Sequence, residues 1–292
     1  MDLTAILFAF LSAVLMGTIG VFAKITGLSA EVITFFRLML GAMFMMLFLI
    51  GTGNVRLLRQ WPSWQVIISG FFLAGFILFY VHSMNYIPMA VAIMLIYLAP
   101  LAASVVAHFF MGEKLNLTGF ALIIAALFGS VMMMELSPDL SVIGLGSSLG
   151  SSKKFIGICF GLLAMIAYAG FIIVTRLIRE EIHVHTRTFY SLLTGACVTI
   201  PFAVMTIQEV TVSHIPWLVG AGLAPGFLGI LFAVIALSRL PAAMFSTIAY
   251  SEPVAVAIFG WTIFNESLSL TQMSGCAIII LSGIIKTLKE RE

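Results

Sequence analysis

The chain has 292 residues, of which 62% are hydrophobic and only 9% are charged, and its formal net charge is +2. An ordinary soluble domain has about 25% charged residues, so this composition cannot cover a surface that faces water. A bundle that faces lipid needs apolar residues on its outside as well as its inside. The composition therefore excludes a soluble globular protein and predicts an all-α membrane protein in a lipid bilayer.

The few polar and sulfur-containing residues exclude several classes of partner. The basic residues occur singly at the ends of apolar segments, so we expect no nucleic-acid partner. Cys159, Cys197 and Cys276 each lie inside an apolar segment, and neither they nor the five histidines have the spacing of a metal site. We therefore expect no metal ion and no cofactor.

The apolar runs divide the chain into ten segments, each near the length of about 20 residues that crosses the hydrocarbon. The stretch between Gln60 and Gly112 contains no Asp, Glu, Lys or Arg but is too long for one span, and Asn85-Tyr-Ile-Pro88 is its natural turn. The predicted spans are 3–23, 31–51, 64–84, 88–111 and 117–135, followed by 155–176, 187–207, 216–237, 241–264 and 270–288.

The basic residues are distributed unevenly between the two sides of these spans. With the amino terminus inside, ten of the 14 Lys and Arg residues fall on the cytoplasmic side. The positive-inside rule therefore predicts a multi-pass protein of the plasma (inner) membrane with both termini in the cytoplasm. The ten are Arg56, Arg59, Lys114, Arg176, Arg179, Arg187, Arg239, Lys286, Lys289 and Arg291.

An internal repeat relates the two halves of the chain. A gapless shift of 153 residues aligns two prolines, a tyrosine and a glutamate, a match that apolar sequences do not reach by accident. Each half holds five spans, an odd number, so the second half is inverted relative to the first, as in many secondary transporters. We expect one repeat at 1–136, a Gly/Ser-rich linker at 137–154 and a second repeat at 155–292. The aligned pairs are Pro88 and Pro241, Tyr97 and Tyr250, Pro100 and Pro253, and Glu113 and Glu266.

Two of the aligned prolines lie in the middle of predicted spans. Pro100 and Pro253 each remove a backbone donor, so they predict kinks or hinges, although a harmless packing kink is the simpler alternative. Each proline follows a tyrosine by three residues, which places Tyr97 and Tyr250 on the same helix faces as the kinks. The tyrosines are candidate substrate-binding residues, or else hydrogen-bonded ties to neighbouring helices.

Charged residues within the spans are costly and often functional. Glu252 is the acidic residue in the middle of a span, and Arg37, in the second span, is its basic counterpart. The pair could form a static tie, or Glu252 could line the cavity and carry a proton. We count both as candidate substrate-binding residues, and proton coupling stays open.

Three further residues complete the candidate binding site. His82 lies near the end of the third span, where its pKa could fall in the physiological range. Met16 and Tyr168 occupy equivalent positions under a shift of 152 residues, and an aromatic ring opposite a thioether suits a pocket for an organic solute. Lipid-facing packing is the alternative for both.

The combined pattern resembles the EamA family of the drug/metabolite transporter superfamily. The resemblance rests on Tyr97-Leu-Ala-Pro100 followed by Met-Gly-Glu113-Lys-Leu, on the equivalent second-half sequence ending in Phe-Asn-Glu266-Ser-Leu, and on Thr-Phe-Phe-Arg37. It implies ten transmembrane helices in two inverted five-helix repeats, around a cavity lined mainly by spans 1, 3, 4, 6, 8 and 9. Met16 stands where many family members carry tryptophan.

The resemblance implies a secondary transporter that exports or exchanges small metabolites, such as amino acids or related amphiphilic solutes, by alternating access. The chain has no P-loop and no nucleophile paired with a base, so we expect no catalytic residues and no enzyme. An uptake permease is the alternative within this class. A membrane scaffold that packs through small residues at Gly157 and Gly161 is the alternative from another class, and a homodimer stays open.

Overall fold

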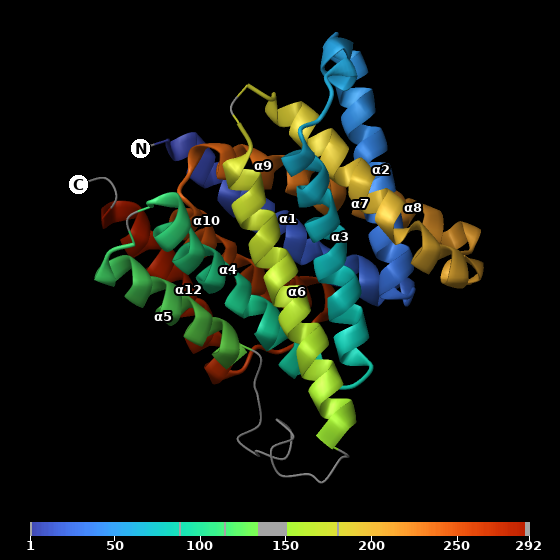
Figure 1. The fold of residues 1–292 in the computed structure, drawn as a ribbon. Coiled ribbons are helices and arrows are strands. Elements are labelled where there is room, and N and C mark those ends of the chain that lie inside the picture. Colours follow the sequence, from blue (N-terminus) through green and yellow to red (C-terminus); the bar gives the residue numbers. More distant parts are fainter. Residues whose placement is uncertain (1, 88, 114, 134–150, 180, 290–292) are drawn as a thin grey trace.

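The computed structural model describes residues 2–87, 89–113, 115–133, 151–179 and 181–289. All regular structure in these ranges is helical (Figure 1). Nine helical stretches of the described residues are long and apolar enough to cross a membrane, and α5, with 17 residues, is a shorter apolar helix. The elements are α1 (Leu3–Thr26), α2 (Ala30–Gly51), η1 (Val55–Arg59), α3 (Trp64–Met84), α4 (Met89–Met111), α5 (Leu117–Met133), α6 (Ser151–Leu177), α7 (Val184–Thr206), η2 (Ile207–Glu209), η3 (Val212–His214), α8 (Ile215–Ala221), η4 (Gly222–Leu228), α9 (Gly229–Arg239), α10 (Ala242–Ala249), α11 (Ser251–Phe264) and α12 (Leu270–Lys289).

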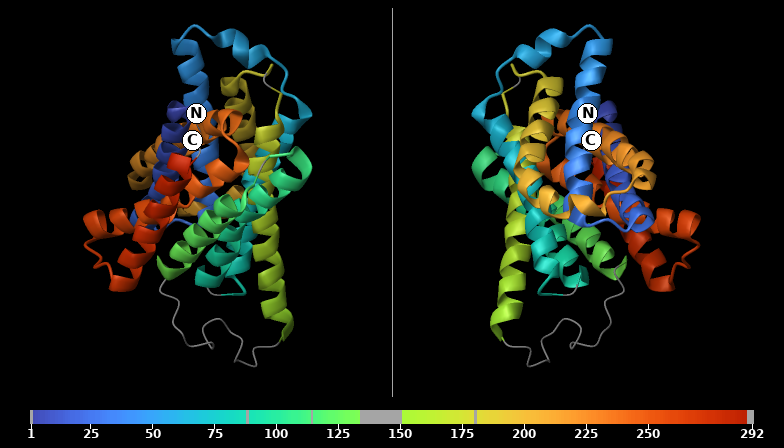
Figure 2. Two further views of the ribbon diagram at one scale, coloured as in Figure 1. Left: turned by 90° about the vertical axis from the view of Figure 1, so that its left-hand side faces the viewer. Right: turned by 90° about the vertical axis from the view of Figure 1, so that its right-hand side faces the viewer.

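These elements confirm the predicted membrane-protein class with ten spans. The eighth span consists of α8, η4 and α9, and the ninth consists of α10 and α11. The start of α1 and the end of α12 lie on the same side of the bundle, which we call the terminal face (Figure 2). The end of α5 and the start of α6 lie on the other side, which we call the linker face. Most of the predicted linker at 137–154 lies outside the described residues, and α6 already begins at Ser151.

The repeat is visible in the local backbone. Gly112 and its equivalent Asn265 both adopt the left-handed conformation that ends a helix, with φ of 69° and 53°. The next residue in each half closes the same loop, since Glu113 N–H donates to Ala107 O at 3.3 Å and Glu266 N–H donates to Gly260 O at 3.1 Å. The two halves therefore share one turn after the fourth and the ninth span.

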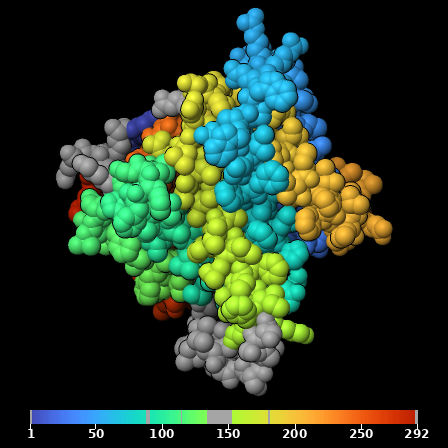
Figure 3. Space-filling view, viewed as in Figure 1, coloured from blue at the N-terminus to red at the C-terminus, as the bar shows by residue number. Residues whose placement is uncertain are grey.

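The halves pack through equivalent helices. Contacts join α2 to α7, α4 to α10 and α5 to α12, each helix meeting its own repeat partner. The contacts between non-equivalent helices are reciprocal as well. The third span of the first half, α3, packs on the first helix of the second half, α6, and α9 in the third span of the second half packs on α1, the first helix of the first half. Figure 3 shows α3 and α6 side by side on one face of the molecule. This pattern is what a two-fold axis in the membrane plane produces.

Two spans of the second half depart from a regular α-helix. The eighth span widens into the π-helix η4, which contains Pro225, and the ninth is interrupted at Tyr250 between α10 and α11. By contrast, α4 runs without a break through Pro100. The shared Tyr-x-x-Pro pattern therefore has different consequences in the two halves.

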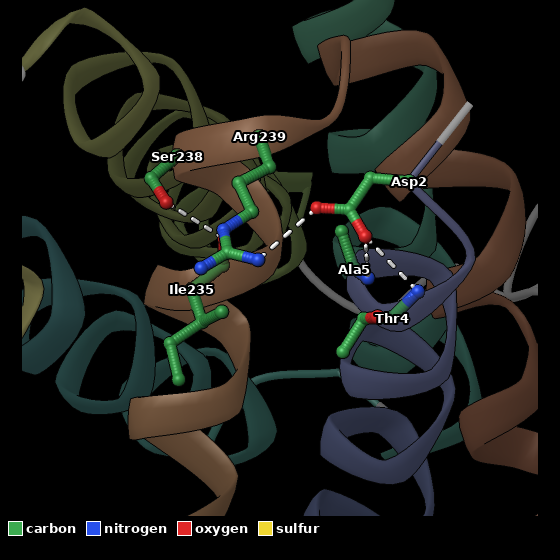
Figure 4. A network of polar contacts seen from close by, with 6 residues as sticks. All are labelled: Asp2, Thr4, Ala5, Ile235, Ser238 and Arg239. Atoms are coloured by element: carbon green, nitrogen blue, oxygen red, sulfur yellow. Dashed lines mark hydrogen bonds and ion pairs between the residues drawn. The ribbon is translucent and has the colours of Figure 1, made fainter.

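The beginning of α1 is held at the terminal face by Asp2 (Figure 4). Its Oδ1 accepts the N–H of Thr4 at 3.0 Å and of Ala5 at 3.2 Å, while Arg239 Nη1 donates to Oδ2 at 3.1 Å. The bond from Ala5, followed by the Arg239 guanidinium, holds the pKa of Asp2 below its ordinary value. One carboxylate therefore caps α1 and ties it to the end of α9.

Two ion pairs connect repeat-equivalent positions on opposite faces. On the terminal face Arg176 Nε lies 3.1 Å from Glu113 Oε1, and Glu113 Oε2 also accepts the N–H of Ala242 at 2.7 Å. On the linker face Lys24 pairs with Glu266. Each pair thus joins the end of the first helix of one half to the turn after the fourth span of the other half.

Candidate functional site

Two equivalent tyrosines meet in the middle of the bundle. The rings of Tyr97 on α4 and Tyr250 at the break of the ninth span lie 6.5 Å apart, edge to face. The Tyr250 hydroxyl donates to the backbone carbonyl of Tyr97 at 2.6 Å. A residue that touches its own repeat partner must lie close to the axis that relates the halves. The contact therefore marks the centre of the fold.

Glu252 is the centre of a cluster of polar side chains around this contact. It interacts electrostatically with Arg37 and with the hydroxyls of Tyr80, Tyr97 and Tyr168. These groups come from α2, α3, α4 and α6, so five spans of both halves meet here. Among the described residues, the Glu252 side chain forms no hydrogen bond or ion pair. We call Arg37, Tyr80, Tyr97, Tyr168, Tyr250 and Glu252 the central cluster.

Arg37 is the positive charge of the central cluster. Its exposed fraction is only 3%, and its Nε and Nη2 atoms have no hydrogen-bond partner in the structure. Its backbone packs against the π-helix η4, where only glycine fits, because a Cβ at Gly226 would overlap Arg37 O. π-helical turns are frequent at functional sites. The family resemblance implies a cavity lined mainly by spans 1, 3, 4, 6, 8 and 9, so Arg37 adds the second span to the candidate site.

Aromatic side chains form one wall of the central cluster. Tyr168 stacks on Phe76 with ring centroids 5.0 Å apart. Tyr80 lies one turn after Phe76 on α3, so both rings share a helix face. The Tyr80 hydroxyl is buried and has no hydrogen-bond partner. Sequence reasoning missed Tyr80, although a tyrosine inside an apolar run, four residues after a phenylalanine, was an available signal.

His82 lies apart from the central cluster. Because it is two residues beyond Tyr80, it points to another side of α3. Its Nδ1 contacts Leu78 O at 2.9 Å, and its ring lies 5.6 Å from Phe160 and 6.2 Å from Phe202. These residues belong to an apolar groove of about 600 Å³ between α3, α6 and α7 that opens toward the outside of the bundle.

Met16 borders the central cluster. The neighbouring Gly17 packs directly on the ninth span, where a Cβ would lie 3.4 Å from Glu252 O. The Met16 side chain reaches toward the end of η4, since its Cε would lie 3.1 Å from a Cβ at Gly229. The two prolines are both buried, and each lies three residues after its tyrosine. The structure thus brings together Arg37, Tyr97, Tyr168, Tyr250 and Glu252, with Met16 at the edge.

The arrangement has the chemical groups that could bind a polar solute. Within the described ranges, the His, Cys, Asp and Glu side chains form no group of three that could hold a metal ion. The central cluster offers one guanidinium, one carboxylate and phenolic hydroxyls, surrounded by aromatic rings. Such a mixture of an apolar wall with a few polar groups is typical of a small-molecule site.

Comparison with known proteins identifies the family. The sequence profile of the EamA-like transporter family matches residues 3–135 and again residues 155–287. The chain belongs to the EamA-like transporter family. The expected resemblance is thereby confirmed, and this family member is a multi-pass membrane transporter.

Similar proteins include several transporters. The chain is 25% identical over 282 residues to an uncharacterized transporter of Archaeoglobus fulgidus, covering 96% of this chain and 94% of the relative. It is 26% identical over 296 residues to the uncharacterized transporter YxxF of Bacillus subtilis, covering 99% and 91%. It is 24% identical over 258 residues to the pseudopaline exporter CntI of Pseudomonas aeruginosa, covering 88% and 86%.

A solved crystal structure has the same fold. It superimposes with a TM-score of 0.83 at 20% sequence identity, and the match covers 99% of both chains. The EamA-like family member therefore shares its whole architecture, and not only one repeat, with a known protein.

Proposed function

We propose that this EamA-like protein is a secondary transporter that exports or exchanges small metabolites, most naturally amino acids or related amphiphilic solutes, by alternating access. The observation that carries the proposal is the central cluster, because polar groups from both inverted halves converge near their common axis. Substrate sites of inverted-repeat transporters tend to lie at that place. Charges within membrane spans are costly, so the presence of Arg37 and Glu252 there favours a function over packing.

One observation supports export from the cytoplasm, because a relative that matches 88% of this chain is an exporter of pseudopaline. The positive-inside rule, applied to the predicted spans, favours termini in the cytoplasm and a position in the plasma (inner) membrane, but it does not bear on the direction of transport. The proposal concerns a single chain, because both halves of the central cluster belong to it and no homodimer is needed.

The scaffold alternative is disfavoured by the packing of its small-residue face. A Cβ at Gly157 would lie 2.7 Å from the Cβ of Tyr86 and from a side-chain carbon of Ile87. The glycine is therefore occupied by contacts with the α3–α4 turn of the same chain. It is not free to dock a partner helix.

Glu252 is the residue through which protons would couple to transport. It faces Arg37 of α2, Tyr80 of α3, Tyr97 of α4 and Tyr168 of α6, and of these groups only Arg37 carries a charge at neutral pH. We expect Glu252→Gln to abolish the pH dependence of flux. Unchanged pH dependence in this variant would remove proton coupling at Glu252 from the proposal.

The direct test is flux in proteoliposomes. Purified protein would be screened for thermal stabilisation by amino acids, nucleosides, organic acids and cationic drugs, since a ligand that binds the folded state raises its stability. Each stabilising solute would then be measured for counterflow into liposomes. We expect saturable counterflow of at least one solute that Tyr97→Phe weakens, and protein that moves no solute would contradict the transport function.

A further inference from the structure

Resting on the proposed function, we propose that the substrate is a small zwitterion whose carboxylate binds Arg37 and whose ammonium group binds Glu252. The two side chains act as one dipolar site. This polarity is inferred from the bonding of the two charges.

The first step is the state of Arg37. Its guanidinium is almost completely buried, and two of its nitrogen atoms have no partner. A buried unpartnered charge is among the most costly groups in a protein, whereas a guanidinium matches the geometry of a carboxylate with two parallel bonds. Arg37 interacts electrostatically with Glu252 and Tyr168 of the central cluster. The unmet donors therefore fit a ligand carboxylate.

The second step is the separation between Arg37 and Glu252. Opposite charges this deep in a membrane would be expected to close into a direct ion pair, yet no ion pair within 4.0 Å joins these two described residues. Three other ion pairs in the described residues do close, at the two membrane faces. Neither side chain is thus occupied by a direct ion pair with the other, so each can pair with an opposite charge of a solute.

The third step is the total charge of the site. When Arg37 is protonated and Glu252 is ionised, the central cluster is neutral, and a bound zwitterion keeps it neutral. A monoanion or a cation would add an uncompensated charge in a region of low dielectric constant, which is costly. The site should therefore select solutes that carry both charges over analogues that lack one of them.

The aromatic wall defines the rest of the solute. Tyr97 and the stacked pair Phe76 and Tyr168 lie beside the two charges and suit an apolar or aromatic side chain. The unpartnered Tyr80 hydroxyl offers an additional donor. An α-amino acid with an apolar side chain meets all these requirements.

The test uses matched probes that differ only in charge. Phenylalanine, phenethylamine and hydrocinnamate share one ring but carry both charges, only the ammonium or only the carboxylate. Leucine, isoamylamine and isocaproate repeat the comparison without a ring. Binding would be measured as thermal stabilisation of the purified full-length protein, and transport as counterflow in proteoliposomes. We expect at least one amino acid to bind about tenfold or more tightly than both of its analogues, since each analogue loses one charge-assisted contact.

Variants then separate the two ends of the site. Arg37→Gln should weaken the amino acid by about tenfold or more while leaving the amine unaffected or favoured. Glu252→Gln should also weaken binding of the amino acid, but it should favour the carboxylic acid instead of the amine. Arg37→Lys keeps the charge and should partly restore amino-acid binding if Arg37→Gln folds poorly. The matched controls are Arg59→Gln and Glu181→Gln, which change exposed residues of the terminal face and should leave the probes' ranking unchanged.

The outcomes distinguish this inference from the proposed function. A reversal of probe preference by the two charge variants would support the dipolar site. Equal binding of an amino acid and its acid or amine analogue, or flux restricted to nucleosides, single-charged acids or cationic drugs, would overturn the zwitterion while keeping the transporter. Absence of flux for every solute would overturn both.

Discussion

The turns at the two membrane faces show how one repeat can serve two environments. Glu113 and Glu266 occupy equivalent positions, end equivalent helices and pair with equivalent bases, Arg176 and Lys24. On the terminal face the side chains of Arg176 and Glu113 are only 28% and 15% exposed, whereas those of Lys24 and Glu266 are 52% and 54% exposed. The repeat thus sets the pairing, and the surroundings set its strength.

The surroundings differ because Glu113 has a second partner. Its other oxygen accepts the N–H of Ala242, the first residue of α10, which draws the carboxylate into the contact between the halves. Lys24 instead lies over the Phe264 ring at 4.3 Å and stays accessible. A half-buried charge pair with an additional backbone bond holds its geometry better than an exposed pair. The ion pair at the terminal face is therefore held more firmly than the one at the linker face.

The largest expected effect tests this difference directly. Glu113→Gln should lower the free energy of unfolding by about 1–3 kcal/mol, because it leaves the partly buried Arg176 without its counter-charge. Glu266→Gln should cost only about 0.2–1 kcal/mol, as exposed pairs do. Denaturation of the purified protein in detergent would measure both, with the exposed Glu181→Gln as control. Equal losses at both faces would contradict the comparison.

The next effect concerns the two prolines. The ninth span is interrupted beside Pro253, whereas α4 continues through Pro100. If only the interrupted span is a hinge, Pro253→Ala should reduce counterflow by about tenfold, equivalent to about 1.4 kcal/mol, by restoring a helical donor. Pro100→Ala should change flux much less. A loss of the same size in both variants would show that both prolines act as hinges.

A smaller effect separates the two central tyrosines. Tyr250 is 1% exposed and its hydroxyl donates to Tyr97 O, so Tyr250→Phe should lower the free energy of unfolding by about 0.5–1.5 kcal/mol. Tyr97→Phe breaks no hydrogen bond seen among the described residues and should change transport rather than stability. Thermal denaturation and counterflow of both variants would show this. A double variant with normal transport would exclude substrate contact by either hydroxyl.

The smallest effect lies at the exposed start of α1. Because the folded-state pKa of Asp2 is below its ordinary value of 3.8, its contacts stabilise the protein above that pH. The contribution is lost as the pH falls through the lower folded-state value. We therefore expect Asp2→Asn to be less stable than the wild type at neutral pH and equally stable in strong acid. A pH series of thermal denaturation would measure this, and a gap that widens in acid would contradict it.

Much of the fold was predictable because it follows from local composition and from the repeat. Runs of apolar residues of membrane length predicted the ten spans, and the aligned pairs, including Glu113 and Glu266, predicted two related halves. The turn at Gly112 and Asn265 then recurs in both. These features depend on residues close in sequence, so tertiary contacts change them little.

The site was predictable only in part. A charged or tyrosine residue in a span is unusual enough to be found by inspection, and this identified Arg37, Tyr97, Tyr168, Tyr250 and Glu252. Sequence alone cannot say which face of a long apolar helix meets the bundle, so it selected His82 on α3 and passed over Tyr80. The direction of both side chains is set by the packing of α3 against α6 and α7.

The sequence by itself determined the membrane class, the inverted halves and the set of rare polar residues, because these depend on composition, length and periodicity. Only the tertiary structure decided that Arg37 and Glu252 stay apart, that the eighth span widens at η4 beside Arg37, and that one of two matching prolines interrupts its span. A freed backbone group or a buried charge takes the partner that neighbouring helices offer. Those neighbours are distant in sequence, so folding alone brings them together.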